Sequence, residues 1–243
     1  MKINHAKVLI TGGTSGIGLA TAAMLKQEGA QVVVTGRDSN RLEKTVTALG
    51  IHGIQADITK EEDVIRLVRE ANQKMNGLNV LINNAGFGYI APLVEIKPEL
   101  FDHVWRTNVL GAALSAKECA KIFIQQNYGN IINIASTSAL KGNATASPYA
   151  ATKFALRGMT ESWREELRKY NVRVMLINPS EVMTSFASNR VTPAGKHLKE
   201  YTDKETQTKL RGEEIAHTIK SLLEMDDRGF VTEVTVFATN PQV

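Results

Sequence analysis

The sequence of 243 residues has little cysteine, few aromatic residues and no long apolar run. Its one cysteine, Cys119, cannot form an internal disulfide, and a chain without disulfides fits a reducing compartment, so we expect a cytoplasmic protein. No apolar run approaches the roughly 20 residues of a membrane-spanning helix, and none follows the first lysine as in a secretory signal. We therefore expect neither membrane contact nor export.

The excess of positive over negative charge is also small, since the net charge is only +4. The basic residues are scattered and are not interleaved with aromatic ones, which argues against nucleic-acid binding. Hydrophobic residues make up 43% and charged residues 22%, as in a globular chain with a sizeable core. There is no linker, repeat or low-complexity segment, so we expect residues 1–243 to form a single domain, and we assign no metal ligands.

Short apolar runs alternate with amphipathic stretches along the chain. The predicted strands are 7–11, 31–35, 51–55, 79–83, 129–135, 171–177 and 230–237. Helical periodicity occupies most of the intervals, including a long region over 99–126 and a last helix over 213–223. This alternation predicts an α/β fold with one doubly wound parallel sheet of about seven strands, a Rossmann fold with helices on both faces.

The first predicted strand runs into the glycine-rich stretch Thr11-Gly-Gly-Thr-Ser-Gly-Ile-Gly18, and a helix follows it. In this context Gly12, Gly16 and Gly18 would let the backbone turn tightly and approach a pyrophosphate at the helix N-terminus. The spacing differs from the usual dinucleotide fingerprint, so a glycine turn without a ligand is the alternative.

The second strand runs into Gly36-Arg37-Asp38. An acidic residue here would bind the adenosine ribose, whereas a basic one would accommodate a 2′-phosphate. We favour Arg37, because Gly36 occupies the place that an acid would need, and Asp38 can cap the next helix. The sequence thus predicts NADP(H) rather than NAD(H).

Polar residues also follow the third and fourth strands. Asp57 either faces a ligand at this strand end or, like Thr59, caps the helix that begins at Lys60. Two successive asparagines and a small Ala-Gly pair form Asn83–Gly86, which suggests close backbone packing on a ligand.

Asn108 stands among apolar residues of the long predicted helix and therefore needs a hydrogen-bond partner. The fifth strand delivers Ser136 and Ser138 to the carboxyl end of the sheet. Beyond it, Tyr149 and Lys153 are i and i+4 residues of a helix and share one face. A nearby ammonium lowers the pKa of a tyrosine, which could then exchange a proton with a substrate oxygen near neutral pH.

With these motifs in order, the sequence resembles the short-chain dehydrogenase/reductase family over nearly its whole length, including its 3-oxoacyl-[acyl-carrier-protein] reductase-like members. The family's motifs match 11–18, Asn83–Gly86, Asn108, Ser136 and the Tyr-x-x-x-Lys pair Tyr149–Lys153. Ser136 rather than Ser138 stands thirteen positions before the tyrosine, as the family's serine does.

The resemblance implies hydride transfer between NADP(H) and a carbonyl or secondary alcohol. Tyr149 would protonate the carbonyl oxygen, and Ser136 would position it. Lys153 would hold the nicotinamide ribose and lower the tyrosine pKa, and Asn108 would order a water in a proton relay. Asp57 would contact the adenine, and Asn84 the ribose region. The implied cofactor-binding residues are Gly12, Thr14, Ser15, Gly16, Ile17, Gly18, Arg37, Asp57, Ile58, Asn84, Ala85, Gly86, Tyr149, Lys153, Pro179, Val182 and Thr184.

Two stretches depart from the family pattern. Ser180 stands where the family usually has glycine and lacks that residue's backbone freedom, so contacts around the nicotinamide can differ. The chain ends Val236-Phe-Ala-Thr-Asn-Pro241 without the glycine pair of many acyl-carrier reductases. This ending weakens the acyl-carrier assignment and any detailed expectation for subunit contacts there.

The substrate stays open among ketones, aldehydes, 3-oxoacyl thioesters, sugars and steroid-like alcohols. We expect residues 184–211 to cover the site, and Phe87, Tyr89 and Leu140 to line or cover the pocket. Residues 185–211 include six basic and three acidic residues. This positive surplus either steers an anionic substrate or carrier protein, or belongs to a solvated surface. The basic residues are Arg190, Lys196, Lys199, Lys204, Lys209 and Arg211, and the acidic ones are Glu200, Asp203 and Glu205.

Two other functions compete with an NADP(H)-dependent reductase. One is NAD-dependent oxidation of an alcohol, sugar or steroid, against which Arg37 speaks. The other is a redox-sensing protein that binds NADP(H) without turnover, which would not require an intact Ser136, Tyr149 and Lys153. By the same resemblance we expect a homodimer or homotetramer with contacts through the long helices 99–126 and 149–170.

Overall fold

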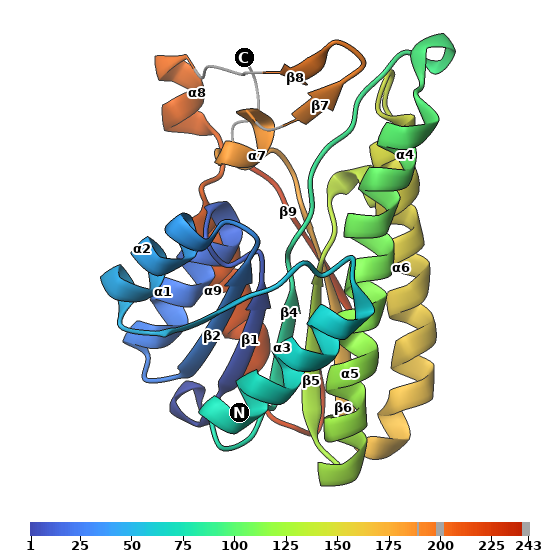
Figure 1. Ribbon diagram of the computed structural model, residues 1–243. Helices are drawn as coiled ribbons and strands as arrows, with labels where there is room; N and C mark the ends of the chain where they lie inside the picture. Colours follow the sequence, from blue (N-terminus) through green and yellow to red (C-terminus); the bar gives the residue numbers. More distant parts are fainter. Residues whose placement is uncertain (189, 198–201, 240–243) are drawn as a thin grey trace.

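Seven parallel strands form the central sheet of the computed structural model, which describes residues 1–188, 190–197 and 202–239 (Figure 1). Their spatial order is β3-β2-β1-β4-β5-β6-β9. The strands are β1 (Lys7–Thr11), β2 (Gln31–Gly36), β3 (His52–Gln55), β4 (Val80–Asn83), β5 (Gly129–Ile134), β6 (Val172–Pro179) and β9 (Glu233–Val236). The fold prediction is therefore confirmed.

Helices cover both faces of the sheet (Figure 1). The main ones are α1 (Gly16–Gln27), α2 (Ser39–Leu49), α3 (Glu61–Lys74), α4 (Pro98–Trp105), α5 (Gly111–Gln126), α6 (Ser147–Leu167) and α9 (Gly212–Glu224). Alternation along β1 explains why both faces need cover. Val8 and Ile10 pack on one side of the sheet, and Leu9 packs on the other.

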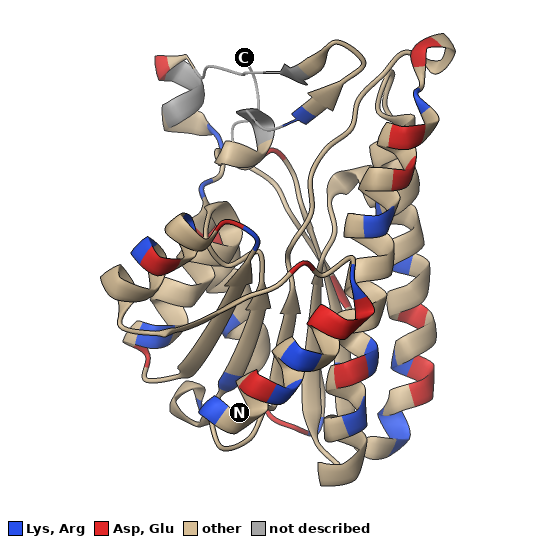
Figure 2. Cartoon of the chain, viewed as in Figure 1, with Lys and Arg blue, Asp and Glu red and all other residues tan. Residues whose placement is uncertain are grey.

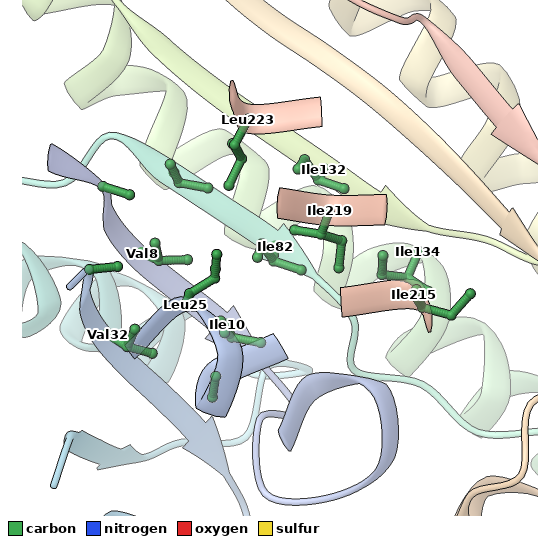
Figure 3. Packing of buried hydrophobic residues seen from close by; sticks show 14 of the residues in the cluster. Val8, Ile10, Leu25, Val32, Ile82, Ile132, Ile134, Ile215, Ile219 and Leu223 are labelled. Carbon is green, nitrogen blue, oxygen red and sulfur yellow. The ribbon is translucent and has the colours of Figure 1, made fainter. Parts of the chain in front are cut away.

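On the first face, α1 and α9 pack side by side against the strands (Figure 3). Leu25 of α1 and Ile219 of α9 are fully buried in this cluster together with Ile82 of β4. On the second face, α3 and α5 bury Leu67 and Phe123 against the sheet. Burying such side chains contributes roughly 1.5–3 kcal/mol each and holds the helices against the sheet.

The direction of chain progression reverses between β1 and β4. From β1 the chain proceeds outward to β2 and β3, then returns to β4 and continues through β5 and β6 to β9. In an open parallel sheet the crevice beyond the carboxyl ends of the strands at such a point is the usual ligand site. The topology thus directs the loops after β1, β4, β5 and β6 toward one place.

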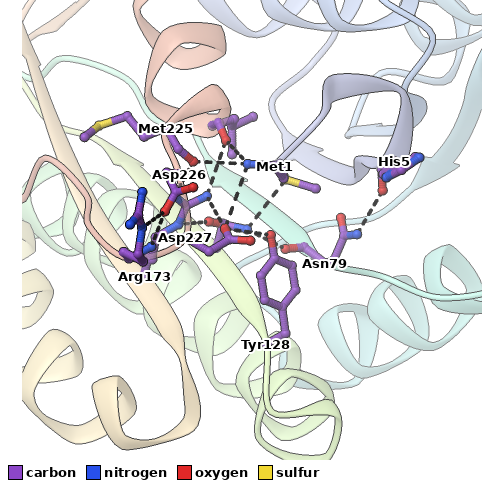
Figure 4. A network of polar contacts seen from close by, with 11 residues as sticks. Met1, His5, Asn79, Tyr128, Arg173, Met225, Asp226 and Asp227 are labelled. Atoms are coloured by element: carbon purple, nitrogen blue, oxygen red, sulfur yellow. Dashed lines mark hydrogen bonds and ion pairs between the residues drawn. The ribbon is translucent and has the colours of Figure 1, made fainter.

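The opposite end of the sheet is closed by a polar network (Figure 4). The amino group of Met1 donates to the carbonyl oxygens of Leu223 at 2.7 Å and Met225 at 3.2 Å. The buried guanidinium of Arg173 donates to Asn130 Oδ1 at 2.7 Å and to the same carbonyl of Met225. These bonds satisfy the end of α9 and hold it beside β5 and β6.

Three predicted elements differ from the structure. The long helix predicted over 99–126 is interrupted by a π-helical turn, η3 (Arg106–Leu110), which separates α4 from α5. The last strand is shorter than 230–237, because its pairing with β6 extends only from Glu233 to Val236. The first helix begins within the glycine stretch, at Gly16, rather than after it.

The predicted covering segment 184–211 has secondary structure of its own, which apolar periodicity did not reveal. It contains α7 (Ser185–Ser188), the hairpin of β7 (Arg190–Thr192) and β8 (Gly195–His197), and α8 (Asp203–Thr208). The hairpin lies above the carboxyl end of the sheet (Figure 1). Residues 189 and 198–201 of this segment, including Lys199 and Glu200, lie outside the described residues.

Charged residues gather on the outer helices, and the strands between them carry few (Figure 2). Among the described residues, no helix combines the length and the apolar character that crossing a bilayer requires.

Candidate active site

A cavity of about 1120 Å3 opens at the carboxyl edge of the sheet. Its walls come from the loops after β1, β2, β3, β4, β5 and β6, from α6 and from the covering segment. Almost all of the residues that the sequence singled out line it. They are Gly12, Thr14, Ser15, Gly16, Ile17, Arg37, Asp57, Ile58, Asn84, Ala85, Gly86, Ser136, Tyr149, Lys153, Pro179, Val182 and Thr184.

The glycine loop leaves no room for side chains at Gly12, Gly13 and Gly18, and two of these glycines pack against the segment that follows β4. Gly12 has φ +65°, and a Cβ there would lie 2.8 Å from the Cα of Ala85. Gly18 lies behind the wall rather than on it, and a Cβ there would lie 2.5 Å from Asn84 Nδ2. The loop is therefore pressed against the end of β4, and the N-terminal turn of α1 presents its free N–H groups to the cavity.

Asn84 and Thr11 tie the loop to β4. Asn84 Nδ2 donates to the carbonyl oxygens of Thr11 and Gly12, both at 3.0 Å. The hydroxyl of Thr11 accepts the backbone N–H groups of Asn84 and Ala85, both at 3.1 Å. The backbone after the fourth strand is packed closely on the glycine loop and fixes it, and the expected packing on a ligand stays a prediction.

One end of the cavity is bordered by the loops after β2 and β3, where Arg37 and Arg41 both lie on the wall. Asp38 is the N-cap of α2, and its carboxylate accepts the Arg41 N–H at 3.0 Å, which confirms the capping interpretation. The sequence reasoning missed Arg41. This residue lies in the first turn of α2, four residues after Arg37, which already accounted for a basic residue near this strand end.

Asp57 also lines this end but does not cap α3, whose N-cap residue is Lys60. Its carboxylate accepts the N–H and the hydroxyl of Thr59, at 3.0 Å and 2.8 Å. Its own N–H donates to Asp63 at 2.9 Å. These bonds fix the loop after β3, so the alternative in which Asp57 or Thr59 caps the helix is wrong.

At the other end, Tyr149, Lys153 and Ser136 meet. Lys153 is 5% exposed, and its ammonium lies 5.7 Å from the centre of the Tyr149 ring. The ammonium donates to the carbonyl oxygen of Ile134 at 2.8 Å, at the last residue of β5. Ser136 lines the same wall as Tyr149, and its hydroxyl accepts the backbone N–H of Ser138 at 3.1 Å. Ser138 also lines the cavity but serves Ser136 through its main chain.

Burial dominates the protonation of this pair. Desolvation raises the pKa of Tyr149 to about 12, against the hydrogen bond from Ser136 and the positive charge of Arg190. Desolvation also lowers the pKa of Lys153 to about 8. The pKa of Tyr149 therefore shifts opposite to the lowering expected from the sequence, because the cost of burying a phenolate exceeds the attraction of nearby charges.

Asn108 lies in the π-helical turn and does not line the cavity. Its Oδ1 accepts the N–H of Phe87 at 3.0 Å, and its Nδ2 donates to the carbonyl of Phe87 at 3.0 Å. The same amide donates to Thr152, whose hydroxyl donates to the carbonyl of Tyr149 at 2.7 Å. Asn108 thus joins the loop after β4 to the helix that carries the tyrosine, and its predicted water-ordering role stays a prediction.

The covering segment closes over the tyrosine. The ring of Phe186 in α7 lies 5.7 Å from the Tyr149 ring, and Arg190 in β7 lines the same wall. Phe87 lines the cavity as expected. Tyr89 and Leu140 do not: Tyr89 is fully buried beneath the loop, and Leu140 is 40% exposed on the surface outside it.

Sequence reasoning missed Phe186 and Thr152, and it named Arg190 only as one of six basic residues in the covering segment. Phe186 stands in a segment without apolar periodicity, and nothing in the sequence distinguishes Thr152 from other helical residues. Only the Tyr-x-x-x-Lys spacing could have drawn attention to the enclosed Thr152. Ser180 lines the cavity, and its N–H is bonded to the carbonyl of Val236 at 2.8 Å, so it continues the strand pairing.

The cavity fits an elongated dinucleotide. It runs from two arginines at one end, past a glycine loop in which added Cβ atoms would collide with Asn84 and Ala85, to Tyr149 and the buried Lys153 at the other. Anionic groups are stabilised beside helix N-terminal N–H groups, which α1 supplies midway along this path.

Comparisons with known proteins agree with this arrangement. Residues 6–194 match the short chain dehydrogenase family. An uncharacterised oxidoreductase of Staphylococcus aureus is 31% identical over 231 residues, which cover 94% of this chain and 95% of that one. The alcohol dehydrogenase of Thermococcus sibiricus, solved with 5-hydroxy-NADP, superimposes with a TM-score of 0.84 at 24% identity, covering 98% of this chain and 99% of that one.

Levodione reductase superimposes with a TM-score of 0.79 at 25% identity, covering 96% of each chain. The matched stretch holds the glycine loop, the Asn-Asn-Ala-Gly turn and the Tyr–Lys pair, the same elements that build the cavity. This chain belongs to the short-chain dehydrogenase/reductase family of oxidoreductases.

Proposed function

We propose that the protein is an NADP(H)-dependent carbonyl reductase, which in reverse oxidises a secondary alcohol. One observation carries the proposal: Tyr149, Lys153 and Ser136 converge on the wall of a cavity that fits a dinucleotide. The relationship to levodione reductase supports the direction of reduction.

NADPH, when bound, supplies the hydride. Tyr149 donates its phenolic proton to the carbonyl oxygen, and its raised pKa keeps this proton in place at neutral pH. Ser136 donates a hydrogen bond to the same oxygen, while the N–H of Ser138 fixes the Ser136 hydroxyl. Lys153, anchored on Ile134, places a positive charge beside the phenolate that forms as the proton leaves.

Asn108 acts as a positioning residue. It bonds both main-chain groups of Phe87 and reaches the helix of Tyr149 through Thr152. Its amide thereby holds two cavity walls at a fixed separation. Its predicted role in ordering a water stays a prediction.

Arg37 and Arg41 support the choice of NADP(H). Both line the adenosine end of the proposed path and would face a 2′-phosphate there. Asp38 is the acidic residue nearest to them in sequence, and its carboxylate already caps α2. Asp57 and Ile58 would border the adenine, and Asn84 retains its amide oxygen for the ribose region.

The test mixes the purified protein with NADPH or NADH and a panel of aldehydes, ketones, sugars and 3-oxoacyl thioesters, and follows the loss of reduced-nicotinamide absorbance. We expect turnover that prefers NADPH and is lost in Tyr149→Phe. In Arg37→Gln/Arg41→Gln the preference for NADPH should fall roughly 10- to 100-fold through its KM, as expected for lost charge-assisted bonds. Cofactor binding without reduction of any carbonyl would contradict the proposal.

We also propose a cytoplasmic homodimer or homotetramer that associates through its long helices. Trp105, Leu110 and Phe154 expose 37–44% of their surface on α4, the π-helical turn and α6. Exposed apolar side chains of this size on adjacent helices suit a subunit contact. A monomeric mass in light scattering would contradict the assembly.

A further inference from the structure

Arg190 stands at the substrate end of the cavity, opposite the end that carries Arg37 and Arg41. It is the first residue of β7 and lines the wall together with Tyr149 and Phe186. Its positive charge reaches the phenol, where it opposes the rise in the pKa of Tyr149 that burial causes. The Phe186 ring lies 5.7 Å from the Tyr149 ring and, like the arginine stem, approaches Gly88, so a group held by Arg190 would lie at the tyrosine end of the cavity.

The position of Arg190 is set by backbone pairing. The N–H of Val191 donates to the carbonyl of Gly88 at 2.8 Å, and the N–H of Ile90 donates to the carbonyl of Val191 at 3.0 Å. Between these bonds, Tyr89 is fully buried, and its hydroxyl accepts the N–H of Lys97 at 2.8 Å. The start of β7 is thus joined to the loop that follows β4.

Gly88 gives the arginine stem its place. A Cβ at Gly88 would lie 3.2 Å from Arg190 Cγ and 3.5 Å from a ring carbon of Phe186. The aliphatic part of the arginine therefore lies directly against the backbone, with the Phe186 ring beside it. Packing of the stem leaves fewer orientations open to the guanidinium than a surface arginine has.

The charge of Arg190 has no counterion in the part of the chain that the structure describes. The described acidic residues on the cavity wall are Asp38, Asp57 and Glu181. Asp38 caps α2, Asp57 accepts two bonds from Thr59, and Glu181 pairs with Lys209 at 2.7 Å. A partly buried cation without an acidic partner favours an anion from the ligand.

We propose that Arg190 binds a carboxylate of the substrate, so that the protein reduces oxo acids to hydroxy acids. The proposal rests on the carbonyl-reductase function and names its substrate class. The planar guanidinium matches a carboxylate with two parallel hydrogen bonds. Of the other described cations on the wall, Arg37 and Arg41 lie at the opposite end, and Lys153 is bonded to Ile134. Arg190 therefore offers one positive charge at the substrate end, which suits a substrate with one carboxylate.

The reaction balances with the proposed machinery. The carbonyl carbon gains a C–H bond from the hydride of NADPH, and the carbonyl oxygen gains the proton of Tyr149 as the C=O π bond is lost. The oxo acid is reduced to a hydroxy acid, NADPH is oxidised to NADP+, and Tyr149 regains a proton from water. The carboxylate keeps its charge throughout and serves only to hold the substrate.

The proposal is tested by measuring kcat/KM for a series of oxo acids and comparing each acid with its methyl ester. The separation between the carbonyl and the carboxylate increases along the series. The wild-type protein should prefer one acid over its ester. In Arg190→Gln, kcat/KM for that acid should fall roughly 10- to 100-fold, the range for a lost hydrogen bond to a charged group, with the ester little changed. Lys97→Gln is the matched control, because Lys97 contacts the same hairpin at Pro193 O, lies off the cavity wall and carries the same charge.

A binding measurement makes the outcome independent of turnover. Calorimetric titration of the hydroxy acid into Tyr149→Phe with NADP+ present should show binding that Arg190→Gln in the same background loses. An equal loss for acid and ester would overturn the proposal, since it would indicate a structural role. A weakened affinity for NADP+ alone would also overturn it, by placing the charge on the cofactor. Reduction of neutral ketones without preference for acids would refute the inference and leave the reductase function intact.

If no carbonyl compound is reduced, the reductase proposal fails, and the titration still decides whether Arg190 binds a carboxylate.

Discussion

The two ends of the cavity differ in whether main-chain groups or side chains form them. The nucleotide end is formed mainly by main-chain groups: the glycine loop, the N–H groups of α1 and the carbonyls that Asn84 holds. At the substrate end, side chains meet from distant segments: Ser136, Tyr149 and Arg190. A main-chain cradle suits a cofactor common to many proteins, whereas a side-chain wall can change its substrate by single substitutions.

Removing the phenol should have the largest effect, and it tests whether the substrate end alone carries the chemistry. Tyr149→Phe keeps the ring beside Phe186 and removes only the proton donor. We expect kcat to fall about 10²- to 10⁴-fold, the range for general acid catalysis, while the Kd for NADPH changes only a few-fold. Stopped-flow kinetics and cofactor fluorescence measure the two. A comparable loss of cofactor binding would show that the two ends are not separable.

Adding a methyl group behind the cradle should break the nucleotide end. In Gly18→Ala the new Cβ would lie 2.5 Å from Asn84 Nδ2 and from the carbonyl oxygen of Gly12. We expect the free energy of unfolding to fall by about 1–3 kcal/mol and NADPH binding to weaken with it, measured by denaturant unfolding and calorimetry.

The matched control is Gly158→Ala in α6, where nothing lies within 4 Å of the added Cβ. Because alanine is the better helix former, this variant should gain about 0.5–1 kcal/mol. Equal effects of the two substitutions would mean that the close approach at Gly18 is not a constraint.

The pH dependence distinguishes the two ionisable groups of the substrate end. Lys153 with a pKa of about 8 is charged below that pH and neutral above it, whereas Tyr149 with a pKa of about 12 stays protonated throughout. The kcat/KM for ketone reduction should therefore be level at low pH and decline as the pH rises through about 8. In Lys153→Met this decline should disappear at a lower overall activity, and a decline that persists would assign the titration to another group.

The smallest effect is expected at Ser138. Its backbone N–H donates to the Ser136 hydroxyl, and alanine keeps that N–H. Ser138→Ala should change kcat/KM by about 2-fold or less, whereas Ser136→Ala should lower it roughly 10-fold or more, since a hydrogen bond to a developing charge is lost. A larger loss at Ser138 would exchange the two assignments.

The same contrast explains what could be read from the sequence. Gly12 and Gly18 can be recognised in the sequence, because close backbone contact excludes other residues at these positions. The apolar runs of β1 and β2 indicate strands that are covered on both faces. Tyr149 and Lys153 are four residues apart on one helix, so local geometry alone brings them together.

Other features depend on contacts between distant segments. Arg190 reaches the site because Val191 pairs with Gly88, about a hundred residues earlier, and no local pattern predicts that pairing. The direction of the Tyr149 pKa shift depends on how completely the fold removes water, which spacing does not reveal. Asn108 in the π-helical turn likewise has its partner in Phe87, about twenty residues earlier.

That turn sets the phase between two helices. In η3 the N–H of Gly111 bonds to the carbonyl of Arg106, five residues back, so the turn holds one residue more than an α-helical turn. One residue corresponds to about 100° of rotation around a helix axis. The extra residue lets α4 present His103 to the cavity while α5 turns Cys119 into the core. Deleting one residue from this turn would rotate α4 by about 100° relative to α5, so His103 and Cys119 could not both keep their present positions.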